Sequence, residues 1–226
     1  MSEASTKDAT SRDPGAKDQG ANDPGTRDHW ETVYATRDET GVSWFQDSPS
    51  PSIELIEQLK PGKDASVIDV GGGASRLVDA LLDRGFRRPT VLDISQGALD
   101  LACLRLGRRA SLAQWITEDV TEWEPSRRFD IWHDRAAFHF LVEASDRAAY
   151  VARLSQALRP GGYAIIATFA PDGPEKCSGL PVYRADAEGL AKELGEAFTL
   201  VESRTHDHVT PSQSRQRFQF SVFRRD

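Results

Sequence analysis

The sequence predicts an α/β fold built on a doubly wound, mostly parallel sheet. From residue 50 onward, short β-branched apolar runs alternate with segments of helical periodicity. Such alternation places helices on both faces of a parallel sheet. The last two apolar runs have no helical pattern between them, so we expect the final strand to be antiparallel.

The elements follow one another in a regular order. Ser50 and Pro51 predict the N-cap and first position of a helix that ends before Pro61. Apolar runs then predict strands at 66–70, 90–94, 113–117, 129–133 and 163–169, and helices at 75–84, 96–106 and 145–158. The two terminal strand-like runs, 198–202 and 216–223, are joined by a polar stretch.

Residues 1–28 differ in composition from the rest of the chain. They contain Asp-Pro-Gly twice and hardly a large apolar side chain after Met1. Such a segment cannot bury enough apolar surface to offset the entropy lost on ordering, so we expect a disordered tail. One folded domain is expected over 29–226. Its first part, 29–49, is a possible N-terminal lid.

Charge and cysteine content limit the possible partners. The formal net charge of −7 over 226 residues argues against a nucleic-acid partner, because phosphate backbones require a basic face. The two cysteines are too few for the disulfide framework of a small secreted protein, and no apolar run reaches membrane length. We expect a cytoplasmic protein with no membrane partner. The sequence carries no signal of oligomeric state.

A glycine-rich turn connects the first expected strand to the helix after it. The segment V-I-D-V-G-G-G-A-S-R-L places Gly71, Gly72 and Gly73 where the strand ends. Glycine permits a sharp turn, and backbone N–H groups at a helix start can face a ligand there. Asp93, followed by Ile94 at the tip of the second strand, can accept hydrogen bonds from ribose hydroxyls. Together these features predict a nucleotide-shaped cofactor.

The glycine spacing distinguishes between nucleotide cofactors. Dinucleotide enzymes prefer G-x-G-x-x-G, and Arg76 occupies the third glycine position. The sequence also has no Y-x-x-x-K pair typical of short-chain dehydrogenases. Instead, Asp69 stands two residues before the first glycine and gives D-x-G-x-G. An NAD(P)-dependent oxidoreductase is therefore a weaker alternative. A non-catalytic nucleotide-binding protein is also weaker, because it would have no reason to place His133, Asp134 and Arg135 at the adjacent strand end.

Four motifs occur in one order: D-x-G-x-G, Asp93, Asp119 in I-T-E-D-V, and L-R-P-G-G-Y. This order resembles the class I S-adenosylmethionine-dependent methyltransferases from about residue 29 to the C-terminus. The resemblance implies a seven-stranded Rossmann-like sheet and S-adenosylmethionine as cofactor. It also implies that Asp69 and the glycine loop hold the amino-acid part of the cofactor. Asp93 with Ile94 would then take the ribose, and Asp119 with Val120 would lie near the adenine.

Chemistry is expected at the carboxyl end of the fourth strand, in F-D-I-W-H-D-R-A-A-F. His133 titrates in the range of a general base, and Asp134 could orient it or act itself. Arg135 could clamp an anionic substrate through its planar guanidinium. Structural alternatives stay open for both residues. His133 could point into the sheet or pack beside Trp132, and Arg135 could pair with Asp134 or Asp146.

The same segment narrows the resemblance. I-W-H-D-R-A-A-F, S-D-R-A-A-Y and the G-L-P-V-Y loop look like the thiopurine and related small-molecule methyltransferases. In that group the arginine of the D-R-G/A-A pattern lies beside the acceptor, which points to Arg135. The stretch with Trp44 and Phe45 is similar to the aromatic segment that covers the cofactor. However, H-W-E-T-V-Y and D-R-A-A-F also resemble protein lysine methyltransferases, so a protein acceptor is the alternative to a small molecule.

Three further features complete the site predictions. The segment from Trp30 to Phe45 and the loop 171–184 are candidates for closing the site. His206, Asp207 and His208 have no further ligand at recognisable spacing, so we expect no metal. His139 is expected to pack in the interior, and Cys177 to be an unreactive loop cysteine.

Overall fold

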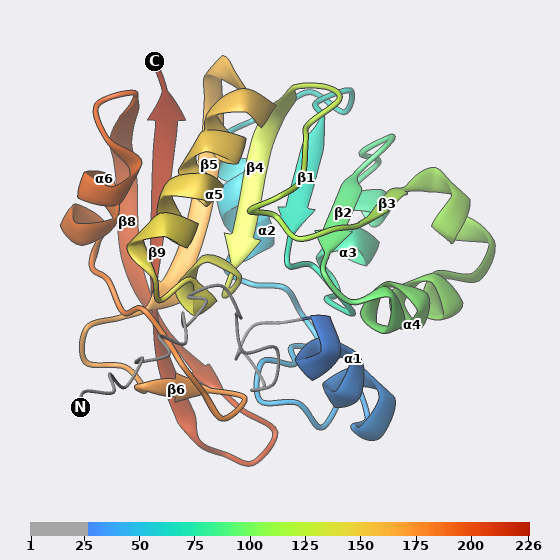
Figure 1. The fold of residues 1–226 in the computed structure, drawn as a ribbon. Helices are drawn as coiled ribbons and strands as arrows, with labels where there is room; N and C mark the ends of the chain where they lie inside the picture. The colour runs from blue at the N-terminus through green and yellow to red at the C-terminus, as the bar shows by residue number, and fades with distance from the viewer. Residues whose placement is uncertain (1–26) are drawn as a thin grey trace, which may run out of the picture.

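The computed structural model describes residues 27–226, and its centre is a seven-stranded sheet (Figure 1). The strand order is β3-β2-β1-β4-β5-β9-β8. The strands are β1 (Val67–Val70), β2 (Thr90–Asp93), β3 (Gln114–Thr117), β4 (Phe129–Arg135), β5 (Leu158–Phe169), β8 (Phe198–Val209) and β9 (Arg215–Arg225). Strands β1 to β5 pair in parallel, and β9 is antiparallel to both β5 and β8. The predicted sheet is confirmed, including its antiparallel final strand.

Helices cover both faces of the sheet, as Figure 1 shows with α5 in front and α2 behind. The first face carries α2 (Ser52–Gln58), α3 (Leu77–Asp83) and α4 (Gln96–Leu106), and the second carries α5 (Ala144–Ala157) and α6 (Ala187–Leu194). Smaller elements are α1 (Arg27–Thr36), two 3₁₀ turns η1 (Gly107–Leu112) and η2 (Phe138–Phe140), and a hairpin of β6 (Lys176–Cys177) and β7 (Leu180–Pro181).

Strand alternation divides the core into two layers. On β4, Ile131 packs with Ile56 and Leu81 on the first face, whereas Trp132 packs with Tyr150 on the second. Successive side chains of a strand point to opposite faces, so a strand covered on both sides buries side chains on both faces. This burial explains why β1 and the second half of β5 appear in the sequence as largely apolar runs.

The structure differs from the predicted boundaries where distant pairing decides them. β4 continues two residues beyond the expected end at His133, because it pairs with β5 as far as Arg135. β8 extends through the stretch expected to be a polar connection, since its backbone pairs with β9 from Phe198 to Val209. The sequence missed α6, whose first turn is capped by the Asp186 side chain accepting from the Gly189 N–H.

The predicted disordered tail lies mostly outside the described residues. Arg27 and Asp28, its last two residues, belong to α1. The rest of the tail, 1–26, is not described. Among residues 27–226, each helix is too short or too polar to cross a bilayer.

Candidate active site

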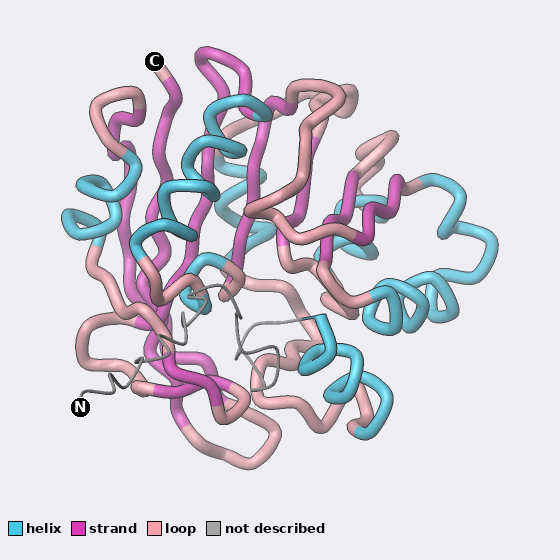
Figure 2. The backbone as a smooth tube through the Cα atoms, in the orientation of Figure 1, coloured by secondary structure: helices cyan, strands magenta, loops and turns pink. Residues whose placement is uncertain are grey.

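The carboxyl ends of the parallel strands point toward a cavity of about 630 Å³, here called the main cavity. In Figure 2 the loops at this end of the sheet gather beside α1. The lining includes Trp30, Tyr34, Trp44, Gly71, Asp93, Ile94, Asp119, Val120, Arg135, Phe140 and Cys177. The structure therefore brings together residues predicted from the glycine turn, from Asp93, from Asp119 and from the end of β4. The volume lies within the range of roughly 300–1,000 Å³ that is typical of small-molecule sites.

Glycine is required at the turn after β1 because neighbouring groups approach it closely. A Cβ on Gly71, which has φ +63°, would lie 2.6 Å from the Ala137 Cβ. A Cβ on Gly72 would lie 2.6 Å from the Asp69 carboxylate. The N–H groups of both glycines donate to the Leu92 carbonyl, at 2.8 and 3.3 Å. The prediction that these N–H groups face the ligand is therefore wrong for Gly71 and Gly72. The absence of side chains at this turn leaves space for a cofactor, but the N–H groups of Gly71 and Gly72 do not serve as donors to it.

Asp93 ends β2 as a buried carboxylate on the wall of the main cavity. One oxygen accepts a hydrogen bond from the Ser95 N–H at 2.8 Å. The other lies 3.0 Å from where a Cβ would stand on Gly73, which has φ +43°. Burial, together with the nearby Asp69 charge, raises the pKa of Asp93 to about 7, although the N–H groups of Ser95 and Gly73 oppose the shift. An acceptor held in this way suits a ligand hydroxyl.

Asp119 follows β3, and its side chain stabilises the turn that it begins. Its Oδ1 accepts from the Thr121 N–H at 2.8 Å and from the Thr121 hydroxyl at 2.7 Å. This Asx-type turn fixes the position of Asp119 and Val120 on the wall of the main cavity. The carboxylate is thus held by its own loop, and both predicted residues lie beside Ile94 and Asp93.

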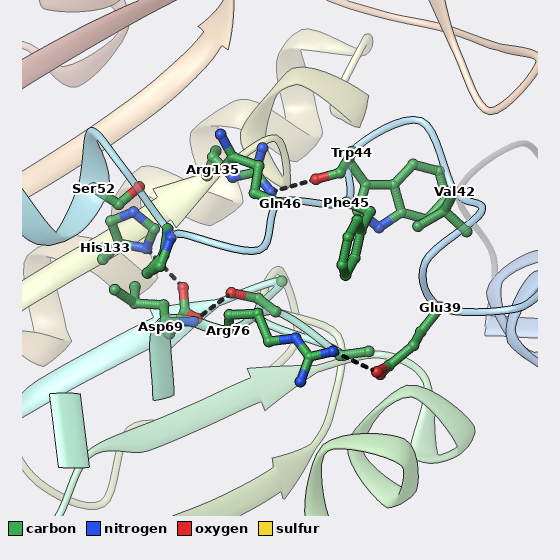
Figure 3. A pocket seen from close by; sticks show the side chains of 16 residues that line it. Glu39, Val42, Trp44, Phe45, Gln46, Ser52, Asp69, Arg76, His133 and Arg135 are labelled. Carbon is green, nitrogen blue, oxygen red and sulfur yellow. Dashed lines mark hydrogen bonds and ion pairs between the residues drawn. The ribbon is translucent and has the colours of Figure 1, made fainter. Parts of the chain in front are cut away.

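His133 lies on the first face of β4, beside Asp69 rather than in the main cavity. The two residues are register partners on adjacent strands, and His133 Nδ1 lies 2.7 Å from Asp69 Oδ1. Both side chains are almost fully buried. They border a second cavity of about 40 Å³, here called the polar cavity (Figure 3). His133 therefore does not stand beside an acceptor in the main cavity, as the general-base prediction requires.

Asp134 points to the opposite face of β4 and lines neither cavity. Its carboxylate accepts from the N–H groups of Ala137 and Phe138, at 2.8 and 3.0 Å, and from the Tyr150 hydroxyl at 2.7 Å. Burial raises its pKa to about 6, and these hydrogen bonds oppose the shift. The prediction that Asp134 orients His133 is wrong, because Asp134 holds the turn between β4 and η2 and His133 contacts Asp69 instead. A direct part of Asp134 in catalysis stays a prediction.

Arg135 ends β4 and borders both cavities. Its Nη2 donates to the Trp44 carbonyl at 2.7 Å, and its buried Nη1 has no hydrogen-bond partner among residues 27–226. Neither Asp134 nor Asp146 forms the ion pair considered above. Burial lowers the pKa of the guanidinium. The next residue, Ala136, has φ +79°, a strained conformation for a residue with a Cβ.

The aromatic N-terminal segment covers the main cavity. Trp30 makes edge contacts with Trp44 and Phe140, with ring centroids 5.7 and 4.9 Å apart. Glu31 accepts hydrogen bonds from the N–H groups of Gln96 and Gly97, at 2.7 and 3.2 Å, at the start of α4. The sequence analysis missed this contact, which joins residues 65 and 66 positions apart. A carboxylate at a helix N-terminus is favoured by the unpaired N–H groups there.

The cysteine and the other histidines that the sequence singled out contact protein groups. Cys177 is buried on β6 and lines the main cavity, and burial raises the pKa of its thiol to about 11. His139 is buried between Phe140 and Phe169, and this burial lowers its pKa to about 3. His208 and Asp207 lie on β8. His208 Nε2 donates to the Ser43 carbonyl, and Asp207 pairs with Arg217 on β9. His206 packs near the Phe220 ring.

Comparisons with known proteins agree with this architecture. Residues 67–162 match a family model described as a methyltransferase domain. The human protein EEF1A lysine methyltransferase 2 is 28% identical over 204 residues, 84% of this chain and 80% of that protein. The mouse protein of the same name is matched over 64% of its own length. Probable thiol methyltransferase 2 of Arabidopsis thaliana is 29% identical over 182 residues, 77% of this chain and 76% of that protein.

Solved structures share the fold. The N-methyltransferase NodS from Bradyrhizobium japonicum, in complex with S-adenosyl-L-homocysteine, has a TM-score of 0.68 at 19% identity and covers 90% of this chain and 99% of its own. A structure concerned with conversion of a disulfide bond into a thioacetal group in echinomycin biosynthesis has a TM-score of 0.72 at 22% identity, covering 89% and 93%. The matched domain, the relatives and this fold together support a class I S-adenosylmethionine-dependent methyltransferase.

Proposed function

We propose that this methyltransferase acts on a small acceptor that carries an anionic group or an ionisable thiol, and that Arg135 holds it. The observation that carries the proposal is the state of the Arg135 guanidinium. It is desolvated, has no carboxylate partner among the described residues, and keeps Nη1 unpaired at the cavity wall. A buried charge without a partner is costly, and an anion beside it would offset that cost.

The residues around the two cavities suit the cofactor as well, with Asp69 at the polar cavity and Asp93 and Asp119 at the main cavity. Asp69 keeps one buried carboxylate oxygen without a partner, which could accept from an ammonium group. Asp93 offers a carboxylate to ribose hydroxyls, and Asp119 with Val120 and Ile94 borders the place proposed for the adenine. The glycine turn leaves open a space that a Cβ would fill. Trp30 and Trp44 would cover the bound molecule.

The proposed chemistry is an in-line displacement, for which the bound cofactor supplies an electrophilic methyl group. The protein contributes alignment and exclusion of water. Holding two reactants in line can supply about 7–11 kcal/mol. Arg135 would orient the acceptor anion toward the cofactor, while Trp30 and Phe140 close the space above. An acceptor that arrives ionised needs no base, which suits a main cavity whose described lining contains no histidine.

A protein lysine acceptor is the second candidate. The relatives named lysine methyltransferases support it, and so do three exposed acids at the mouth of the main cavity, Glu118, Glu143 and Asp146. Such acids could attract a lysine ammonium group. The relative named a thiol methyltransferase supports the small acceptor. Arg135 also favours the small acceptor, because its positive charge would repel an ammonium group deeper in the cavity.

Transfer of a labelled methyl group separates the two candidates. The purified protein is incubated with methyl-labelled S-adenosylmethionine and a cell extract, which is then divided into low-mass and macromolecular fractions. The proposal predicts label in the low-mass fraction, with Arg135→Ala reducing it far more than Arg135→Lys. Label confined to protein, or equal activity of Arg135→Ala, would refute the small anionic acceptor. Asp64→Asn, at an exposed ion pair with Arg87, is the control.

A further inference from the structure

The polar cavity collects buried polar atoms that lack partners. Five of them belong to residues that border it: Gln46 Oε1, Ser52 Oγ, Asp69 Oδ2, His133 Nε2 and Arg135 Nη1. Figure 3 shows these side chains around one space between β1, β4 and the segment before α2. Leaving a buried polar atom unpaired costs about 1–3 kcal/mol. Several such atoms around one cavity therefore point to a polar occupant.

The contact between His133 and Asp69 decides which atoms remain available. A carboxylate can only accept, so the imidazole donates its Nδ1–H to Asp69 Oδ1 across the 2.7 Å contact. His133 Nε2 is then an acceptor in the neutral ring, and Asp69 Oδ2 is a second one. Gln46 Oε1 adds a third acceptor. Three acceptors around one space complement an ammonium group.

The position of His133 is fixed by the sheet. β1 and β4 pair in parallel with Asp69 opposite His133, so the two side chains leave the same face side by side. Both are almost fully buried, and no other residue among 27–226 bonds to the same carboxylate oxygen. The imidazole therefore determines how the Asp69 carboxylate is turned and which of its oxygens stays free.

We propose that His133 is a positioning residue, which turns the Asp69 carboxylate so that Oδ2 receives the ammonium group at the amino-acid end of the cofactor. This inference rests on the proposed seat of the cofactor at Asp69 and the glycine turn. In this role His133 exchanges no proton with the acceptor. Gln46 and Ser52, which precede the matched methyltransferase domain, complete the polar surroundings of that ammonium group.

Two ligands that differ only at the amino-acid end test the inference. S-Adenosylhomocysteine carries the ammonium and carboxylate, whereas 5′-methylthioadenosine lacks both. Calorimetric titration of His133→Ala should show binding of S-adenosylhomocysteine weakened by about tenfold or more, the loss of roughly one charged hydrogen bond. Binding of 5′-methylthioadenosine should stay within about twofold of the wild type, because that ligand makes no contact with Asp69 Oδ2.

Further variants separate positioning from folding and from proton transfer. His133→Asn keeps an N–H donor and should recover part of the affinity, whereas His139→Asn changes a neighbouring buried histidine that does not touch Asp69 and should leave both affinities unchanged. With S-adenosylmethionine as substrate, His133→Ala should raise KM more than it lowers kcat.

Three outcomes would overturn the inference while leaving the proposed cofactor seat in place. Unchanged binding of S-adenosylhomocysteine by His133→Ala would do so, and so would equal loss of both ligands. A fall in kcat at saturating cofactor, with KM unchanged, would return His133 to the role of a base. If the wild-type protein bound neither ligand, the proposed cofactor seat would itself be wrong, and this inference would fall with it.

Discussion

The carboxylate of Asp93 is expected to destabilise the cofactor-free protein at neutral pH, and Asp93→Asn should remove that cost. Burial raises its pKa from 3.8 to about 7. Above pH 4 the unfolded chain releases this proton, whereas the folded protein retains it until about pH 7. The folded state is therefore penalised as the pH rises through this range. At about 1.4 kcal/mol per unit, the cost is on the order of 2 kcal/mol at pH 5 and 4 kcal/mol at pH 8.

Denaturant unfolding at both pH values measures this cost. Asparagine keeps an oxygen for the Ser95 N–H but carries no charge. Burying its amide has a cost that does not depend on pH, so that cost cancels when the two pH values are compared. The free energy of unfolding of Asp93→Asn relative to wild type should therefore increase by about 2 kcal/mol between pH 5 and pH 8.

The control is Asp64→Asn, which alters an exposed acid paired with Arg87 and should change stability by less than about 1 kcal/mol at either pH. If the free energy of unfolding of Asp93→Asn relative to wild type stays the same or falls between pH 5 and pH 8, the reasoning is refuted. The same variant should bind S-adenosylhomocysteine more weakly, since the stabilising change removes the charge offered to the ribose.

Three other changes test the surroundings of the site. Glu31→Ala removes both bonds to the start of α4 and should weaken docking of α1 by about 1 kcal/mol, seen as faster amide hydrogen exchange in α1; unchanged exchange would contradict it. Ala136→Gly relieves a φ of +79° and should raise the free energy of unfolding by about 1 kcal/mol, with a loss of stability as the contrary result. Tyr150→Phe removes a donor to Asp134 and should lower stability by about 1–3 kcal/mol without changing kcat. A fall in kcat would restore Asp134 to the site.

The fold could be predicted from the sequence because its strands are buried on both faces. β1 and the second half of β5 are largely apolar runs, and α4 begins and ends where its pattern predicts. The prediction of strand length failed where hydrogen bonds between backbones, rather than the side-chain pattern, set the ends of a strand. β8 is largely polar, and its length comes from hydrogen bonds to β9, which no periodicity reveals. Helix α6 has only 8 residues and contains Gly189, so its pattern is weak.

The site could be predicted only in part, for a similar reason. Asp93 and Asp119 could be placed at the cavity because Asp93 ends one parallel strand and Asp119 follows another, and such ends converge at one edge of the sheet. His133, Asp134 and Arg135 were grouped because they are adjacent in sequence. As β4 continues through all three, alternation sends Asp134 to the opposite face. The contact of Asp69 with His133 joins residues 64 positions apart and depends on strand register, which the sequence alone did not define.

Titration calorimetry of S-adenosylhomocysteine into the wild-type protein and into Asp93→Ala tests the proposed cofactor seat most directly, with NAD as the comparison ligand. We predict a single site for S-adenosylhomocysteine in the wild type, a marked loss of affinity in Asp93→Ala, and no binding of NAD. Equal affinity of the two proteins for S-adenosylhomocysteine, or binding of NAD in its place, would contradict a cofactor site built on Asp69, Asp93 and Asp119.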